Sequence, residues 1–321
     1  LATGRNTVWC ASLLAAWKAL QDEVSGGTVQ LDGAADLSDS LNAHRDPRLD
    51  IPQDSIYAAA GRVEEGIVAR IREDLGGRFP EAPAPEFLGV DPKGLVVYAK
   101  LQANVRFRMP YHQNSRPLCF RDSGGVVSEV KSFGLPTESR DFCLDLRLSQ
   151  PRVVFVQSAD DALPWYLVDL DRTSEPNQVL VAYIERKETL RAAVAAVQEA
   201  LQEGDPHSVV MADTPLSPTD VLLVPEVVLK VGKRFEELEG RTLVNPSFAG
   251  VRLDVVRQDV EFTFDRSGAA LRSDALMMTL GLARDLIFDR PFLIVMRTRA
   301  AEQPYFAMWV DNAQFLVPFE S

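Results

Sequence analysis

The chain has 321 residues, of which 46% are apolar, and it carries a formal net charge of −12. This length and apolar content allow a large buried core, as one large domain or two small ones. The acidic balance argues against a nucleic-acid partner, because phosphate contacts require clustered Lys and Arg. No apolar run approaches the roughly eighteen residues of a membrane-spanning helix, so we expect no membrane segment.

The cysteines and the missing motifs narrow the chemistry further. Cys10, Cys119 and Cys143 are an odd number without CxxC spacing, which argues against a disulfide framework and against a zinc site. No Gly-rich phosphate loop precedes a helix, and no GxSxG motif is present, so we expect no cofactor and no enzyme activity. The first residue is Leu and no signal peptide is visible, from which we expect a processed or trimmed N-terminus.

The first third of the chain predicts two helices and a long strand. A short strand leading into a helix is expected over 6–24, before the Gly26-Gly27 pair. Residues 55–75 predict a second helix, with one apolar stripe and Ser55 as its cap. The proline-rich residues 79–92 predict a stiff connector, and 95–107 predict a long strand.

The middle of the chain predicts an antiparallel sheet with one helix beside it. Alternating or continuous apolar runs predict strands over 142–148, 152–157, 163–170, 179–184, 221–225 and 227–231. Helical spacing of apolar residues predicts a long helix over 187–202 and a short one over 233–243.

The last part of the chain contains an ambiguous segment between two clear strands. Val260–Phe264 alternate apolar and polar residues, which is typical of a half-buried strand. Phe292–Met296 are continuously apolar, which predicts a central strand buried on both faces. The connection between them, over residues 265–284, is long for a compact domain, and such segments are usually functional or disordered.

This arrangement resembles the serpin family. Gly268-Ala269-Ala270 resemble the small-residue hinge that precedes the family's reactive loop, and Ile287–Leu293 resemble the strand pair that follows it. Tyr305–Asn312 resemble the family's final strand, with Met308 and Trp309 in place of its Gly and Arg. In the strand at 95–107, Tyr98 stands where the family has Asn.

The resemblance implies a fold and a set of general properties. It implies an α+β fold of mostly antiparallel sheets with helices packed to one side, formed by a single domain over residues 1–321. The family's first helix is missing, so the chain resembles a shortened, prokaryotic-type member. We expect a monomer without cofactor or metal, and the resemblance favours an extracellular or cell-envelope location.

The resemblance also implies a suicide inhibitor of a serine or cysteine protease. The target protease cleaves an exposed loop at about 266–285, and the loop then inserts into the main sheet as a new strand. The hinge would be Gly268, Ala269, Ala270 and Leu271. The candidate scissile region is Leu280, Gly281, Leu282, Ala283 and Arg284.

The alternation of residues in the segment is compatible with insertion. A strand alternates its side chains between two faces, so one face would bury Ala269, Leu271, Ser273, Ala275 and Met277. Arg272 and Asp274 then fall on the outward face, while Leu271 is bulky for an inward position. Leu280 or Leu282 at the cut favours a protease with a hydrophobic primary pocket, whereas Arg284 would suit a trypsin-like pocket.

Other interpretations remain open. A relative with the same fold that binds or scaffolds without trapping a protease fits the same residues. A cysteine hydrolase would use Cys10, at a helix N-terminus, with His44, His112 or His207 as its base, although a small buried Cys is the simpler interpretation. Asp160-Asp161 and the pair Asp169 and Asp171 lack calcium-loop spacing, so we expect them in surface turns.

Overall fold

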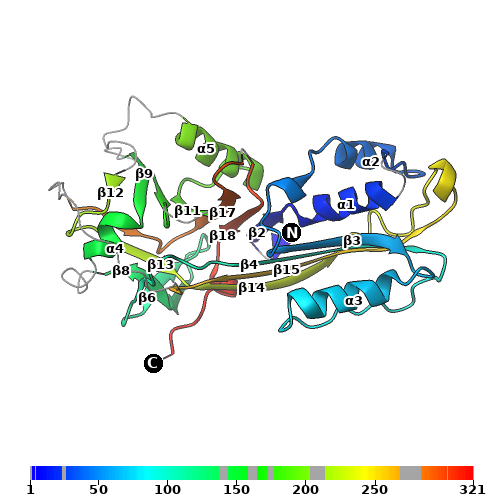
Figure 1. The fold of residues 1–321 in the computed structure, drawn as a ribbon. Coiled ribbons are helices and arrows are strands. Elements are labelled where there is room, and N and C mark those ends of the chain that lie inside the picture. The colour runs from blue at the N-terminus through cyan, green and yellow to red at the C-terminus, as the bar shows by residue number, and fades with distance from the viewer. Residues whose placement is uncertain are drawn as a thin grey trace. The chain divides into compact units, whose positions relative to one another are not determined.

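The computed structural model describes residues 2–3, 5–23, 27–136, 144–157, 165–172, 177–202, 214–267, 283–301 and 303–320. The chain forms two compact units (Figure 1). The first comprises residues 1–9, 104–229 and 262–321, and the second comprises 10–103 and 230–261. Among the described strands, four contain residues of both units, namely β2 (Asn6–Cys10), β4 (Leu95–Asn104), β14 (Val227–Arg234) and β15 (Leu253–Phe264).

An eight-stranded sheet is the largest element of the first unit. Its spatial order is β1 (Ala2–Thr3), β2 (Asn6–Cys10), β18 (Phe306–Val310), β17 (Phe292–Thr298), β11 (Asn177–Tyr183), β10 (Trp165–Asp169), β9 (Arg152–Gln157) and β12 (Thr214–Pro215). Strand β17 pairs antiparallel with β11 and β18, and its residues Phe292–Met296 are buried. The predicted central strand is therefore confirmed, and the adjacency of β2 and β18 brings the N- and C-terminal segments together.

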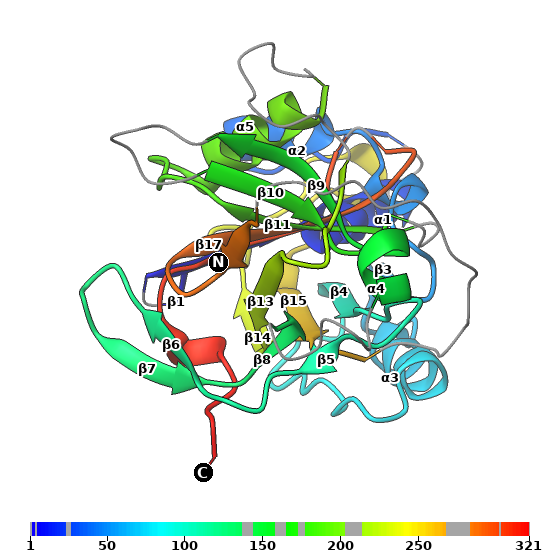
Figure 2. The same cartoon turned by 90° about the vertical axis from the view of Figure 1, so that its left-hand side faces the viewer.

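Helix α5 (Leu190–Gln202) covers one face of this sheet. Its residues Ala193 and Val197 pack against Leu180, Leu293 and Trp309. The opposite face is equally apolar, which explains why the central strands show no alternation. Figure 2 shows α5 lying over β9, β10 and β11.

Two smaller sheets complete the first unit. One has the order β16 (Asp285–Ile287), β13 (Val221–Pro225), β8 (Ser132–Leu135) and β5 (His112–Gln113), with β13 and β16 parallel. The other is the hairpin of β6 (Leu118–Arg121) and β7 (Val127–Val130), which stands out at the lower left of Figure 2. Helix α4 (Leu144–Ser149) and the 3-10 helix η4 (Ala313–Phe315) complete the unit.

Helix α4 corrects one expectation, because 142–148 were predicted as a strand. The described part of that range belongs to a helix in which Leu146 and Arg147 are both buried. The Arg147 guanidinium donates to the carbonyls of Asp220 at 2.6 Å and Pro136 at 3.2 Å. The alternation of Leu144, Leu146 and Leu148 with polar residues imitates a strand, but the structure forms a helix there and buries Arg147 in these contacts.

The second unit is built on a four-stranded sheet with the order β14, β15, β4 and β3 (Ile56–Arg62). Helices α1 (Ser12–Glu23) and α3 (Ile67–Arg78) lie on opposite faces of it, as Figure 1 shows. Trp17 and Leu20 of α1 pack in one apolar cluster, and Ile71 and Leu75 of α3 pack in another. Helix α2 (Ala35–Asn42) and the 3-10 helices η1 (Pro47–Leu49) and η3 (Pro246–Phe248) complete the unit.

Strand β3 corrects a second expectation. The helix predicted over 55–75 is wrong in its first half, because Ile56–Arg62 pair antiparallel with β4. Ala60 belongs to the cluster with α1, whereas Tyr57 and Ala59 belong to the cluster with α3. Burial on both faces removes the alternation that would have identified a strand, and the alanine run favours a helix by intrinsic propensity.

The helix predicted over 233–243 is also wrong. Strand β14 continues to Arg234, and turns follow it instead of a helix. Phe235, Leu238 and Leu243 pack against the α1 cluster from this irregular segment, which explains their helix-like spacing. None of the helices in the described ranges is long and apolar enough to cross a membrane. The fold is α+β, as the sequence predicted.

Candidate reactive segment and its anchors

The predicted reactive segment joins two strands of different sheets. Strand β15 ends at Phe264, and β16 begins at Asp285 beside β13. The predicted hinge, Gly268–Leu271, and the residues Leu280–Leu282 lie outside the described residues. Ala283 and Arg284 are described, so the structure defines how the segment is held at both ends.

The entry end is fixed by backbone hydrogen bonds to the chain after β4. The N–H groups of Phe107 and Tyr111 donate to the carbonyls of Ser267 and Arg266, at 2.9 and 3.0 Å. The Asp265 carboxylate accepts the Ser267 N–H at 2.7 Å. Phe264 packs beside Phe107, with 6.3 Å between ring centroids, so the chain is anchored up to residue 267.

The exit end is anchored by an ion pair between Arg284 and Asp220. The Asp220 carboxylate is fully buried and accepts the Arg284 Nη2 at 2.6 Å, its Nε at 3.0 Å and its backbone N–H at 2.8 Å. The Arg284 guanidinium also donates to Thr214 and to the Pro215 carbonyl, both at 3.0 Å. The Val221 N–H donates to the Arg284 carbonyl at 2.8 Å, so side chain and backbone are both engaged.

Strands β4 and β15 are parallel neighbours, and side chains bridge them. The Tyr98 hydroxyl donates to Asp259 at 2.8 Å, and the Lys100 ammonium contacts Glu261 at 2.8 Å. The partners advance together along the chain, which is the register of a parallel pair. Lys100 is 3% exposed and Glu261 17%, and burial beside Asp259 raises the pKa of Tyr98. We call these two contacts the seam pairs.

Comparison with known proteins identifies the fold. No family model and no curated protein sequence matches the chain. Its structure is similar to native protease nexin-1 crystallised with heparin, with a TM-score of 0.60 over 96% of this chain and 92% of that one, at 10% identity. It is also similar to Manduca sexta serine protease inhibitor (serpin)-12, with a TM-score of 0.57 over 97% and 93%, again at 10% identity. The chain has the serpin fold.

Within this serpin fold, Cys10 has the surroundings of a structural residue. It is 6% exposed, and its Sγ lies 3.2 Å from the Ser12 hydroxyl and accepts the Gln258 amide at 2.6 Å. Burial raises the pKa of the Cys10 thiol, although the bond to Ser12 opposes the shift. A nucleophile needs a lowered pKa, so the environment contradicts the hydrolase interpretation.

No histidine hydrogen-bonds Cys10 among the residues that the structure describes. His44 contacts the Ser40 carbonyl at 2.7 Å, and none of the Cys10 contacts in the described part of the chain is a histidine. His207 lies outside the described residues. A catalytic cysteine and histidine pair is therefore not formed by the residues that the structure describes.

The predicted surface turn at Asp169 and Asp171 is wrong, because both residues are buried. Asp169 accepts from Arg299 at 2.9 Å and from Gln178 at 2.8 Å, and Asp171 accepts the Arg108 N–H at 2.8 Å. Each carboxylate is thus neutralised or hydrogen-bonded within the protein. No cluster of metal-ligating residues occurs in the described ranges, and Asp160-Asp161 lie outside them.

The residues that anchor the candidate segment and those of the seam pairs follow no local sequence pattern. Asp220 pairs with Arg284, which is distant in the sequence, and no short-range sequence pattern indicates this ion pair. Asp259 and Glu261 were visible only as the polar positions of an alternating strand. Tyr98 alone carried a signal, since it departs from the serpin pattern at that position.

Proposed function

We propose that the chain is a serpin-type inhibitor whose target protease cuts segment 266–285, after which the part before the cut inserts between β4 and β15. One observation carries this proposal: the segment leaves the end of β15, which is a parallel neighbour of β4. A strand that turns back from β15 runs antiparallel to both neighbours. Antiparallel pairs are slightly more stable per residue than parallel ones, so insertion replaces one weaker ladder with two stronger ladders.

The sequence of the segment supports its insertion between β4 and β15. With Ala269, Ser273 and Ala275 facing inward, Arg272 and Asp274 stay in solvent. A register slip of one residue would bury both charges, at a cost of several kcal/mol each. Leu271 opposes insertion, because overpacking costs about 1–3 kcal/mol.

The ion pair that anchors Arg284 affects which protease can cut the segment. A trypsin-like pocket must take the arginine side chain out of its contacts with Asp220, Thr214 and Pro215. Leu280 and Leu282 precede this anchor and need no such rearrangement at residue 284. This difference supports a target with a hydrophobic primary pocket, cutting among residues 280–283.

A second candidate function is a binding or scaffold protein that keeps the serpin fold without trapping proteases. The seam pairs favour it, because insertion moves β4 and β15 from about 4.8 Å to roughly 9.6 Å apart. In their present conformations, Tyr98 and Asp259 then lose their 2.8 Å contact, as do Lys100 and Glu261. Loss of a buried pair is strongly destabilising, which raises the barrier to insertion.

The test is incubation with chymotrypsin-like and trypsin-like proteases, followed by denaturing gel electrophoresis and N-terminal sequencing of the fragments. A chymotrypsin-derived adduct that survives SDS, with a cut among residues 280–283, supports the inhibitor. Clean cleavage without an adduct supports the scaffold. A sole cut after Arg284 contradicts the proposed specificity, and Asp220→Asn distinguishes protection by the ion pair from poor recognition, because it should expose Arg284 to trypsin.

A further inference from the structure

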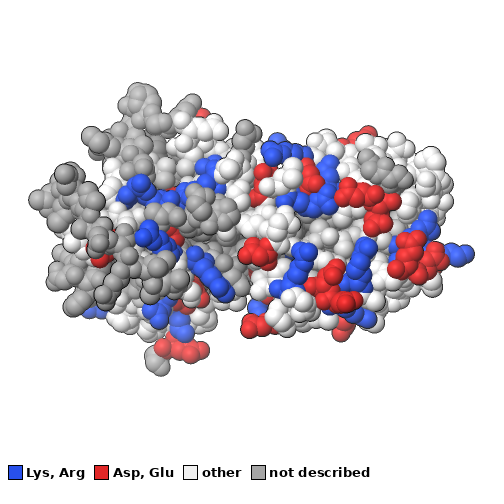
Figure 3. Space-filling view, in the orientation of Figure 1, with Lys and Arg blue, Asp and Glu red and all other residues white. Residues whose placement is uncertain are grey.

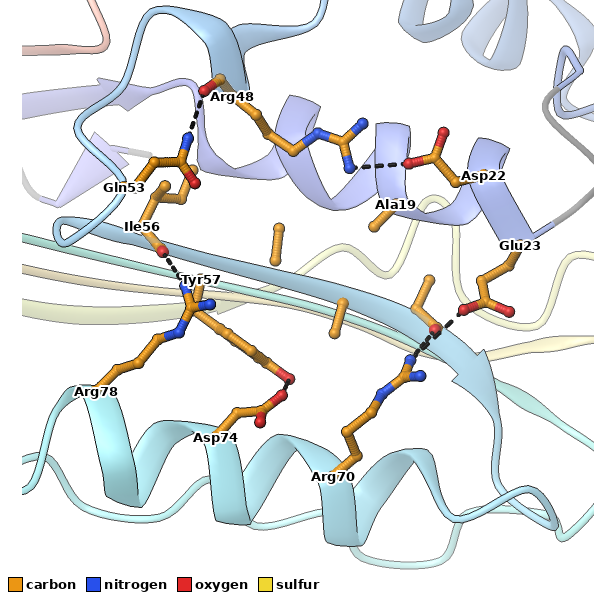
Figure 4. Close-up of a pocket in the computed structure, with 13 residues that line it drawn as sticks. Ala19, Asp22, Glu23, Arg48, Gln53, Ile56, Tyr57, Arg70, Asp74 and Arg78 are labelled. Atoms are coloured by element: carbon orange, nitrogen blue, oxygen red, sulfur yellow. Dashed lines mark hydrogen bonds and ion pairs between the residues drawn. The ribbon is translucent and has the colours of Figure 1, made fainter.

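A cavity of about 360 Å³ lies in the second unit, along the free side of β3. Figure 4 shows it between α1 on one side of the strand and α3 on the other. The backbone of Ile56–Ala60 forms its floor, and α1 and α3 provide charged side chains at its walls. Among the described strands, β3 pairs only with β4 and is the last strand of its sheet, so no described strand covers its other side.

The register of β3 shows which backbone groups face the cavity. The Gln102 N–H donates to the Ser55 carbonyl, and the Val63 N–H donates to the Gly94 carbonyl, so these odd-numbered residues face β4. Backbone direction alternates along a strand, and therefore Ile56, Ala58 and Ala60 direct their N–H and C=O groups to the open edge. The outward backbone groups of an edge strand are a template for another strand.

Two arginines of α3 occupy the ends of this edge. Arg78 donates to the Ile56 carbonyl at 3.3 Å, and Arg70 donates to the Ala60 carbonyl at 2.8 Å. Ala58 lies between them, and no described residue hydrogen-bonds its outward N–H or carbonyl. The side chain of Arg70 is 52% exposed, so its contact with the edge can be exchanged at low cost.

The charged side chains of the α1 wall and of the α3 wall differ in how well they are paired. On α1, Asp22 pairs with Arg48 at 2.9 Å. On α3, Asp74 accepts the Tyr57 hydroxyl at 2.9 Å, and Arg70 reaches Glu23 only at 3.6 Å. Arg78 has no carboxylate partner among the described residues. The α3 wall therefore presents arginines that an incoming carboxylate can satisfy.

We propose that the open edge of β3 binds an extended, acidic segment of a partner protein, which adds to the sheet as a further strand. Its backbone pairs with Ile56, Ala58 and Ala60, and its carboxylates face Arg70 and Arg78. Side chains on the other face of the added strand meet the α1 wall, where Glu23 favours small or basic residues. Figure 3 shows acidic and basic side chains interspersed over the region of α1, β3 and α3, which fits a segment with opposite charge preferences on its two faces.

The concave shape of the site favours a single strand over a second copy of the chain. Helices α1 and α3 flank the edge on both sides, as Figure 4 shows, and a second β3 would bring its own flanking helices. Strand addition derives its affinity from main-chain hydrogen bonds and its specificity from alternate side chains. Both properties can be measured separately.

The experiment uses a blocked hexapeptide of alternating Asp and Val, with binding to the intact protein measured by titration calorimetry. Two further versions carry N-methyl groups on alternate residues, one on the first set and one on the second. We expect one set of methyl groups to weaken binding by about tenfold or more, since it removes the ladder donors, and the other set to have little effect. Equal effects of the two sets, or no measurable binding, overturn the proposal.

Protein variants test the side-chain contacts and the edge. Arg78→Gln should weaken binding of the peptide about fivefold to tenfold, whereas Arg72→Gln, an exposed arginine of the same helix outside the cavity, should not. Ala58→Pro removes the central donor at a position where an edge strand tolerates proline, and it should abolish binding. Equal effects of the two arginine variants, or dimerisation through β3 that excludes the peptide, contradict the proposal even if Ala58→Pro fails to fold.

Discussion

Two places in the sheet of the second unit, the boundary between β4 and β15 and the outer edge of β3, are occupied by side chains in different ways. Between β4 and β15, the buried seam pairs join neighbouring strands, and Lys100 is only 3% exposed. At the outer edge of β3, the half-exposed Arg70 and the exposed Arg78 extend from α3, and each donates to one backbone carbonyl of β3. Breaking the seam pairs costs much free energy, because they are buried. The hydrogen bonds from the arginines to β3 can be replaced by hydrogen bonds from another donor. If the proposed insertion takes place, it has to overcome this barrier, whereas the proposed addition at β3 depends on the sequence of the partner.

The largest effect tests whether the seam opens. If the segment inserts, a single cut between residues 279 and 283 should raise the melting temperature by about 7 °C, because roughly 5 kcal/mol of new pairing and burial is gained. Ser273→Arg, on the inward face, should abolish this shift, while Asp274→Arg, on the outward face, should preserve it. Differential scanning calorimetry before and after cleavage measures both, and an unchanged melting temperature in the cut wild-type protein contradicts insertion.

The second effect concerns the ion pair of the seam. Lys100→Ala should lower the free energy of unfolding by about 3–5 kcal/mol, because it leaves Glu261 without its partner in a largely buried site. The double variant Lys100→Met with Glu261→Met should recover most of that loss, since no unpaired charge remains. Urea denaturation measures the difference, and a double variant as unstable as the single one would show that the charge is not the cause.

The third effect concerns the neutral partner of the seam. Tyr98→Phe should cost about 1–3 kcal/mol, because Asp259 loses a donor while the apolar ring is retained. In the cut protein, the same variant should insert faster, since one contact fewer must break. Stopped-flow fluorescence after cleavage gives the rate, and an unchanged rate would mean that Tyr98 does not limit opening.

The stability contributed by Tyr98 should also depend on pH. Its pKa is raised above the ordinary value of 10.0, by burial first and by Asp259 second. Above pH 10 the unfolded chain loses this proton while the folded protein keeps it, so folding stability falls as pH rises. The stability difference between the wild type and Tyr98→Phe should therefore be constant below about pH 9 and shrink above pH 10. Urea titrations at both pH values check this sign.

The smallest effect concerns the outer edge. Arg70→Gln should change the free energy of unfolding by less than about 0.5 kcal/mol, because the side chain is exposed and its contact with Glu23 spans 3.6 Å. Urea denaturation of Arg70→Gln and Lys100→Ala under the same conditions compares the two losses of unfolding free energy directly. A loss at Arg70 as large as the loss at Lys100 would remove the distinction between the seam pairs and the outer edge of β3.

The parts of the fold that the sequence predicted are those where a pattern reports burial directly. Phe292–Met296 were assigned to a central strand because a strand covered on both faces needs no polar residues. The same reasoning fails at Ile56–Arg62, where an alanine-rich strand covered on both faces has the composition of a helix. Only the pairing with β4 decides between them, and pairing is a property of the folded chain.

The two strands that flank the candidate segment were predictable from the sequence, but the contacts that hold its ends were not. The length of the connection after Phe264 made it a candidate functional segment. The ion pair of Asp220 and Arg284 and the contacts of Tyr98 and Lys100 join residues that are distant in the chain. A single sequence carries no periodicity for such contacts, so their discovery required the structure.

The central position of β17 determines what a protease can release. Any cut between residues 279 and 283 separates a C-terminal fragment that contains β16, β17 and β18, and β17 is hydrogen-bonded on both sides within the eight-stranded sheet. The nicked protein should therefore remain one particle with unchanged mass in gel filtration, and the fragment should separate only in denaturant. If the fragments before and after this cut are expressed separately, we expect them to associate through the pairing of β17 with its neighbouring strands, as in fragment complementation.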